Sequence, residues 1–170
     1  MARGNNALVS FDANYRPRLW PSAEAARAGI MKGVSTCDIC KLNEVELEFL
    51  SGITDPEEGV RWVLDQGPAL GAITLGGDGV HFGNARSRGH VPAFEVDEVD
   101  TTGCGDAFVA GLAAGVCDAV RDGLTLADCP AERLHQIFHF ANAVGALAAT
   151  ATGAMVALPT REQVEGFLHT

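Results

Sequence analysis

The sequence predicts an α/β protein with a mostly parallel, doubly wound sheet and helices on both of its faces. Short apolar runs alternate along the chain with longer segments that begin at Ser, Asn or Pro and end at Gly. This is the pattern of strands that alternate with helices. Apolar residues make up 47% of the 170 residues, which suits close packing of helices on a sheet and argues against disorder.

Three strands and three helices are expected before residue 76. In chain order they are a strand at 8–11, a helix at 22–33, a strand at 38–42, helices at 43–50 and 56–66, and a strand at 70–75. Ser22 and Asn43 stand where helix N-caps are needed, and Pro56 stands where a first helical turn tolerates proline. Gly52 follows the second helix as its stop signal.

The rest of the chain continues this alternation. The expected elements are a turn at 76–79, a strand at 80–82 that completes a hairpin, a strand or loop at 89–99, a helix that follows Asp106, a helix at 131–149, and a last helix capped by Thr160. No linker, repeat or low-complexity tract divides the chain. We therefore expect residues 1–170 to form one part of one domain.

The charge of the chain excludes several classes of partner. Twelve basic residues stand against twenty-two acidic ones, which gives a net charge of −10. Without a basic cluster, nucleic acid and anionic membranes are poor partners. A nucleotide is still compatible with this charge, because backbone N–H groups and metal ions hold phosphates. The apolar run at 7–11 is too short for a signal peptide and no stretch is long enough to span a membrane, so a cytoplasmic location is expected.

Two patterns that are typical of metal or redox sites are expected to be neither. Cys37 and Cys40 form a C-x-x-C, but they fall in a predicted strand, where side chains three residues apart point to opposite faces. His135 and His139 lie four residues apart on one helix face, with Gln136 where a zinc protease motif has glutamate. We expect thiols that do not meet and a solvated helix face.

The segment Asp-Thr-Thr-Gly-Cys-Gly-Asp, from Asp100 to Asp106, carries the strongest chemical signal. Two glycines flank one small residue just before an apolar helix, so the backbone N–H groups of residues 103–106 are expected to be accessible to an anion. Asp106 is either an ordinary dipole-compensating residue of the first helical turn or a proton acceptor beside that anion. Phe108 stands where a dinucleotide fingerprint needs glycine, and no P-loop lysine is present.

The run Asp-Thr-Thr-Gly-Cys-Gly-Asp-Ala-Phe-Val-Ala-Gly resembles the C-terminal signature of ribokinase-like (PfkB-type) carbohydrate kinases, which usually have Ala at position 104. This resemblance implies a ribokinase-like three-layer αβα fold. It implies Asp106 as the catalytic base and Gly103, Cys104 and Gly105 as the anion hole of an in-line phosphoryl transfer. Cys104 is interpreted as a small-residue substitution rather than a nucleophile, because no histidine lies near it in sequence.

Other segments match this family in the same order and span nearly the whole chain. Phe-Asp-Ala-Asn-Tyr-Arg at 11–16 resembles F-D-x-N-x-R, which implies substrate contacts from Asp12, Asn14 and Arg16. Residues 74–79 resemble the T-x-G-x-x-G nucleotide loop, and a helix that flanks adenine in the family is matched near residue 142. The implied nucleotide-binding residues are Thr74, Gly76, Gly79 and Asn142. Without the resemblance these residues would indicate only a hairpin turn and close helix packing.

The resemblance also implies metal sites. Lys-Leu-Asn-Glu-Val-Glu at 41–46 resembles K-x-N-x-x-E, whose Asn and Glu order a hydrated Mg²⁺ and the ATP phosphates; here these are Asn43 and Glu46. Spacing alone would indicate a helix cap and a solvated acid. Asp100 and Thr102 match positions that hold a monovalent cation, K⁺ being the candidate, in several members. ATP and Mg²⁺ are the expected cofactors, and a sugar is the expected partner.

Within the family, residues 19–27 and 88–95 are most similar to fructokinases. Kinases of 2-keto-3-deoxygluconate share the Asn-Tyr-Arg-Pro-x-Leu-Trp run at 14–20 and are the alternative. The chain begins near the midpoint of the family's core, so the N-terminal half and the β-sheet lid, which supply most sugar contacts, are expected to be absent. A truncated nucleotide-binding fragment without catalysis is therefore a second class of function. An uncovered sheet edge would favour self-association or a homo-oligomer.

Overall fold

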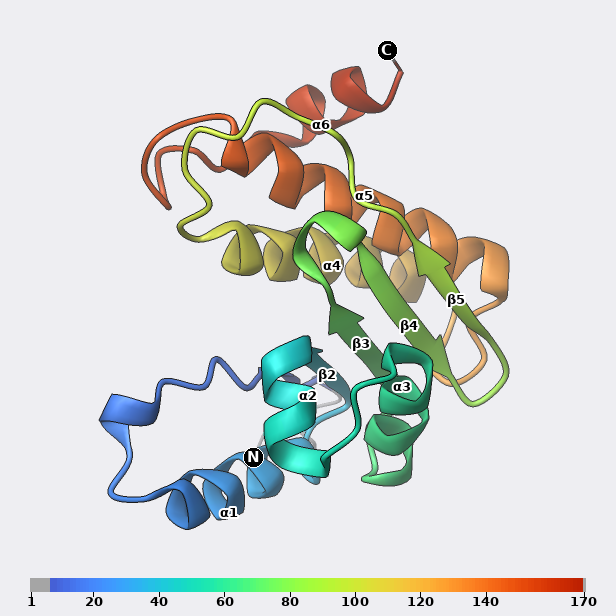
Figure 1. Ribbon diagram of the computed structural model, residues 1–170. Coiled ribbons are helices and arrows are strands. Elements are labelled where there is room, and N and C mark those ends of the chain that lie inside the picture. Colours follow the sequence, from blue (N-terminus) through green and yellow to red (C-terminus); the bar gives the residue numbers. More distant parts are fainter. Residues whose placement is uncertain (1–6, 170) are drawn as a thin grey trace. The chain divides into compact units, whose positions relative to one another are not determined.

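The computed structural model describes residues 7–169, and its α-helices and strands follow the predicted order (Figure 1). The elements are β1 (Ser10–Asp12), the 3-10 helix η2 (Pro17–Leu19), α1 (Ala23–Val34), β2 (Ile39–Asn43), α2 (Glu44–Ser51), α3 (Pro56–Asp65), β3 (Leu70–Thr74), the 3-10 helix η3 (Gly76–Asp78), β4 (Val80–Asn84), β5 (Arg88–Val91), α4 (Cys104–Arg121), α5 (Ala131–Ala149) and α6 (Arg161–Leu168).

The described residues divide into two compact units. The first unit contains residues 7–75, 81–88 and 126–128. The second unit contains residues 76–80, 89–125 and 129–169. The assignment of residues 1–170 to a single catalytic domain stays a prediction.

The strands form one sheet in the order β1-β2-β3-β4-β5. β2 pairs in parallel with both β1 and β3. β4 follows β3 through residues 75–79, a connection too short for a parallel crossover, so the sheet is mixed. The α/β fold class is thereby confirmed. β1, β2 and β3 end at Asp12, Asn43 and Thr74, and the carboxyl ends of parallel strands meet at one edge, where α/β proteins bind ligands.

The helices of the first unit begin at capping side chains. Ser22 accepts a hydrogen bond from the N–H of Ala25 at 3.2 Å, and Asp55 accepts one from the N–H of Glu58 at 2.7 Å. Each bond satisfies a donor that the first helical turn leaves without a partner. The apolar faces of these helices and of β2 and β3 share one core, formed by Ile30, Val34, Leu42, Leu47, Leu50, Val60, Val63 and Ile73 with Cys37 and Cys40.

The second unit is built on two long helices, α4 and α5, of 18 and 19 residues. They approach closely at Gly111, where an added Cβ would lie 2.9 Å from the Cα of Ala141. A residue without a side chain is therefore required at position 111 by the packing of the two helices. α6 buries Val164 among residues of α4 and α5, and the capping box of Thr160 and Gln163 starts it as predicted.

The prediction that the thiols of Cys37 and Cys40 cannot meet is wrong. β2 begins at Ile39, so Cys37 precedes the strand and the two-residue alternation does not apply to it. Both side chains are buried, and the Cys37 thiol lies 3.2 Å from the carbonyl oxygen of Val34. A hydrogen bond between the two thiols is the largest cause that raises the pKa of Cys40, with burial second. The raised pKa keeps the Cys40 thiol protonated within the core.

The hairpin of β4 and β5 was not predicted, although Asn84 gives a signal for it. Its Oδ1 accepts hydrogen bonds from the N–H groups of Arg86 and Ser87 at 3.0 and 2.8 Å. Its Nδ2 donates to the carbonyl of Leu126 at 2.9 Å. An asparagine that closes such a turn with its side chain is a known turn signal.

Two predictions concern surfaces. Across residues 7–169, none of the helices is long and apolar enough to cross a membrane. β1 lies at one end of the strand order, and self-association through this edge stays a prediction.

Candidate active site

The N-terminus of α4 has a backbone conformation that requires glycine. Gly103 is the N-cap residue and has φ 83°, in the left-handed region. A Cβ at this position would lie 2.6 Å from the Cβ of Ala154, so a side chain would be excluded by packing as well as by conformation. The helix consequently starts without a capping side chain, and its first N–H groups are left to other acceptors.

Part of the predicted anion hole is occupied by the chain itself. The N–H of Cys104 donates to the carbonyl of Thr101 at 3.2 Å, so the expectation that all N–H groups of residues 103–106 are free is wrong for Cys104. The N–H groups of Gly105 and Asp106 have no acceptor within residues 7–169. Two adjacent amides at a helix start can still hold a phosphate oxygen.

Asp106 is the third residue of α4 and is exposed. Its carboxylate makes no hydrogen bond or ion pair with any described residue. It lies one residue from the free N–H of Gly105 and carries its own free N–H. The carboxylate is thus available to accept a proton beside the amides that an anion would occupy.

The carboxylate of Asp100 holds the loop that precedes α4 in the chain. Its Oδ1 accepts from the N–H of Thr102 at 2.9 Å, and its Oδ2 accepts from the N–H of Gly153 at 3.1 Å. Hydrogen bonds from the side chain and N–H of Thr102, and from Gly153, lower the pKa of Asp100 below its ordinary value. A cation role for Asp100 and Thr102 stays a prediction, while a role in positioning the helix start follows from these bonds.

Cys104 has the environment of a thiol and not of a thiolate. Burial is the largest cause that raises its pKa, and the charges of Glu98 and Asp100 add to it. A raised pKa keeps the sulfur protonated at neutral pH and lowers its reactivity. The interpretation of Cys104 as a small-residue substitution agrees with this finding.

The candidate nucleotide loop, residues 74–79, is held in place by contacts with β5. Gly79 has φ 92°, and a Cβ on it would lie 2.1 Å from the carbonyl oxygen of Val91. His90 contacts the carbonyl oxygen of Asp78 through Nε2 at 2.8 Å. Asn142 donates to the carbonyls of Val91 and Pro92 at 3.1 and 2.9 Å. The amide nitrogen of Asn142 therefore fixes the strand end on which the loop rests, and contact with a nucleotide would have to come from its oxygen.

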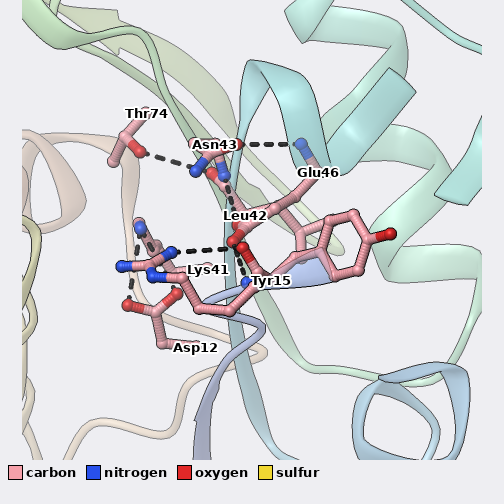
Figure 2. Close-up of polar contacts among 8 residues, drawn as sticks. Asp12, Tyr15, Lys41, Leu42, Asn43, Glu46 and Thr74 are labelled. Carbon is pink, nitrogen blue, oxygen red and sulfur yellow. Dashed lines mark hydrogen bonds and ion pairs between the residues drawn. The ribbon is translucent and has the colours of Figure 1, made fainter. Parts of the chain in front are cut away.

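At the strand ends of the first unit, a partly buried ion pair joins β1 to β2. Lys41 is 6% exposed, and its Nζ lies 3.3 Å from Oδ1 of Asp12, its neighbour in the parallel register (Figure 2). Lys41 is the first residue of the K-x-N-x-x-E motif and was not predicted to be a site residue. Its position in a buried strand was the available signal, since a buried lysine needs a partner.

Asn43 and Glu46 form a capping box at the start of α2. Oδ1 of Asn43 accepts from the N–H of Glu46 at 2.8 Å, and Oε2 of Glu46 accepts from the N–H of Asn43 at 2.9 Å. Thr74, at the end of β3, donates its hydroxyl to the carbonyl of Leu42 at 3.4 Å. Glu46 is only 2% exposed, so the alternative of a solvated acid is wrong. Ordering of Mg²⁺ by this pair stays a prediction.

The turn after β1 carries the candidate substrate residues. Asn14 has φ 43°, the one described non-glycine residue with positive φ. Asn14 and Arg16 are exposed, and Arg16 donates from its guanidinium to the carbonyl of Tyr15 at 3.2 Å. Substrate binding by Asp12, Asn14 and Arg16 stays a prediction.

His135 and His139 are both exposed on α5, and the ring of His139 packs against Phe94 with ring centroids 4.9 Å apart. Within the described chain no group of three or more His, Cys, Asp or Glu residues is arranged to hold a metal ion. The exposure of both histidines agrees with the expected solvated helix face, while the expectation that they bind no zinc stays a prediction.

Comparison with known proteins adds to this geometry. Residues 1–161 match the model of the pfkB family carbohydrate kinases. Fructokinase-1 of Oryza sativa subsp. japonica is 42% identical over 165 residues, which are 96% of this chain and 50% of the rice protein.

Two solved structures are similar in fold. An aminoimidazole riboside kinase from Salmonella enterica, complexed with aminoimidazole riboside and an ATP analog, has a TM-score of 0.82 and 36% identity; the match covers 99% of this chain and 55% of that one. A fructokinase double mutant from Vibrio cholerae O395, with fructose, ADP and potassium ion bound, has a TM-score of 0.81 and 34% identity over 95% of this chain and 50% of that one. The chain spans about half the length of the relatives it matches.

Proposed function

The chain belongs to the pfkB family of carbohydrate kinases, and from this premise we propose that it carries the phosphate-binding and proton-accepting part of an ATP-dependent sugar kinase. One observation supports the proposal above the others. Asp106 is exposed and without a partner in the described chain, beside two backbone N–H groups that have no acceptor there. Phosphoryl transfer needs both groups in one place.

In this mechanism the sugar hydroxyl attacks the terminal phosphorus of ATP and Asp106 accepts the hydroxyl proton. The new bond joins the sugar oxygen to phosphorus, and the bond from phosphorus to the bridging oxygen of ADP breaks. The N–H groups of Gly105 and Asp106 stabilise the negative charge on the transferring group. Gly103, which must lack a side chain, keeps these amides accessible.

The metal and nucleotide residues of the proposal are those that the family resemblance implies, apart from Glu46, which is buried and accepts hydrogen bonds from two backbone amides. A divalent cation, proposed to be Mg²⁺, would neutralise the phosphates of ATP. Asn43 is partly exposed, so its side-chain amide could contact the water molecules that surround the cation. Mg²⁺ usually keeps several water ligands, which polar side chains can bind through hydrogen bonds. Thr74, Gly76, Gly79 and Asn142 are proposed at the nucleotide, and Asp100 with Thr102 at a monovalent cation such as K⁺.

Fructose is the proposed sugar. The rice relative is a fructokinase, and so is the Vibrio cholerae neighbour that holds fructose and ADP. A 2-keto-3-deoxygluconate is the alternative substrate, supported by the shared run at residues 14–20. A nucleotide-binding chain without turnover is the alternative of another class, because about half the length of the relatives is not represented in this chain.

Measurement of sugar-dependent ADP release tests the proposal. The chain, alone and joined to the N-terminal half of a matched fructokinase, is supplied with Mg-ATP and either fructose or 2-keto-3-deoxygluconate. We expect ADP release that depends on fructose in the joined protein and little in the chain alone, because the sugar must be held in line for transfer. ATP binding without ADP release in the joined protein would favour the non-catalytic alternative. Faster ADP release with 2-keto-3-deoxygluconate than with fructose would make the keto-acid, and not fructose, the proposed substrate.

A further inference from the structure

The turn after β1, residues 13–16, is held in place by a contact with α2 that no capping function explains. Oε1 of Glu46 accepts a hydrogen bond from the N–H of Tyr15 at 2.8 Å. The capping box uses only the other oxygen, Oε2, which accepts from the N–H of Asn43. One buried carboxylate therefore joins two segments that are 31 residues apart in sequence (Figure 2).

Aromatic packing reinforces the same connection. The ring of Tyr15 stacks on Phe49, one helical turn after Glu46, with centroids 4.2 Å apart and an angle of 11° between the planes. The guanidinium of Arg27 lies 5.1 Å from the centroid of Phe49 and donates to the carbonyl of Leu50. The turn is thus fixed at its backbone by Glu46 and at its side chain by Phe49.

The turn has a conformation that such support explains. Asn14 adopts φ 43°, in the left-handed region that asparagine tolerates better than other residues with a Cβ but that still costs some free energy. The neighbouring residue, Tyr15, is the one that α2 holds. Asn14 and Arg16 on either side are exposed, so the fixed residue presents its neighbours to solvent.

We propose that Glu46 is a positioning residue for the turn at 13–16, and that it acts through the N–H of Tyr15 and not through a metal ion. Its two oxygens accept from two backbone amides, and 2% exposure leaves little room for the water ligands of a cation. The consequence for substrate binding rests on the function proposed above. A displaced turn would misplace Asn14 and Arg16 and weaken sugar binding.

Amide hydrogen exchange of Tyr15, followed by NMR in the chain itself, tests the positioning role without any activity. In Glu46→Gln the amide nitrogen cannot accept a hydrogen bond, so one of the two backbone donors loses its acceptor. We expect exchange at Tyr15 to accelerate at least about tenfold, as a local opening would require. Glu44→Gln is the matched control, because Glu44 is exposed in the same helical turn and loses the same charge. Glu46→Ala removes both acceptors, so unchanged protection of Tyr15 in folded Glu46→Gln and Glu46→Ala variants would overturn the proposal.

A second variant covers the case in which Glu46→Gln does not fold. Phe49→Leu removes the ring on which Tyr15 stacks and keeps both hydrogen bonds of Glu46. It should also accelerate exchange at Tyr15, by at least about threefold, since the turn loses one of its two supports. No change in this variant would contradict the account of a turn held from both sides.

Kinetics of the joined kinase separates positioning from metal binding. Glu46→Gln and Phe49→Leu should both raise the KM for sugar, by about tenfold in the first case, and leave the Mg²⁺ concentration for half-maximal rate unchanged. A raised Mg²⁺ requirement in Glu46→Gln alone would overturn the proposal in favour of a metal role. If the joined kinase releases no ADP, the proposed function fails while the exchange experiment still decides the role of Glu46.

Discussion

α2 and α4 both place an acidic residue at their third position, and the two acids are used in opposite ways. Glu46 is buried and accepts hydrogen bonds from two backbone amides, whereas Asp106 is exposed and has no partner in the described chain. The difference begins at the N-cap residue. Asn43 has a side chain that bonds to the helix, while Gly103 has none and lies at φ 83°.

The cap residue therefore decides what the acid of the first turn can do. A helix start that is closed by a capping box has fewer N–H groups left for a ligand, and its acid becomes part of the structure. A glycine-capped start leaves both the N–H groups and the carboxylate to external chemistry. The next four predictions test this contrast.

Asp106→Asn should give the largest effect on activity. In a joined kinase that turns over, we expect kcat to fall by about 10²- to 10⁴-fold, because the amide cannot accept the hydroxyl proton. Nucleotide affinity should fall little or rise, since a charge that repels phosphate is removed. Asp118→Asn, in the same helix, is the control, because Asp118 lies in surface ion pairs only. If Asp106→Asn retained a tenth of the parent activity, Asp106 would not be the catalytic base.

Glu46→Ala should give the largest effect on stability. It leaves the partly buried N–H groups of Tyr15 and Asn43 without an acceptor, and we expect the free energy of unfolding to fall by about 2–4 kcal/mol. Asp106→Ala should change it by less than about 1 kcal/mol, as is usual for an exposed side chain. Urea denaturation measures both. Equal decreases in the free energy of unfolding for Glu46→Ala and Asp106→Ala would contradict the structural difference between the two acids.

Gly103→Ala and Gly52→Ala separate packing from backbone strain. Gly52 follows α2 at φ 77° with no atom within 4 Å of an added Cβ, whereas at Gly103 that Cβ would meet Ala154 at 2.6 Å. We expect Gly52→Ala to lower the free energy of unfolding by about 1–2 kcal/mol and Gly103→Ala by at least about 1 kcal/mol more. Only Gly103→Ala should weaken nucleotide binding. Equal decreases in the free energy of unfolding for the two variants would show that contact with Ala154 is not what requires glycine at position 103.

Asp100→Asn should have a small effect that depends on pH. The folded state lowers the pKa of Asp100 below its ordinary value of 3.8, so the charged form is favoured on folding. The stabilisation that the charged carboxylate of Asp100 gives is fully present at pH values above the ordinary pKa. It is lost as the pH falls through the lower pKa of the folded state. Thermal denaturation should therefore show a higher Tm for the parent than for Asp100→Asn at neutral pH and a shrinking difference below about pH 4. A difference that stays constant down to acid pH would contradict this linkage.

Most of the fold could be predicted from local sequence signals. Ser22, Asn43 and Thr160 cap helices as expected, and the bounds of α5 agree with the prediction. The failures came from positions where tertiary structure decides. Cys37 lies just outside β2, so a period of two gave the wrong side-chain direction.

The candidate site was predictable in its residues and less so in their bonds. Gly103 and Asp106 have the conformation and exposure that a motif before an apolar helix indicates. The bond from Glu46 to Tyr15 joins residues far apart in sequence, and no local pattern indicates it. Asn142 likewise donates to carbonyls about 50 residues away, which short-range spacing cannot show.

The most direct test of the contrast between the two helix starts is an NMR titration of the chain with Mg-ADP, in which backbone amide shifts are followed. We expect saturable shifts at the amides of Gly105 and Asp106 that exceed the shift at Glu46, because the N–H of Glu46 donates to Oδ1 of Asn43 while the first two have no acceptor in the described chain. Saturation of binding with no shift at Gly105 and Asp106, or with a larger shift at Glu46, would contradict this contrast.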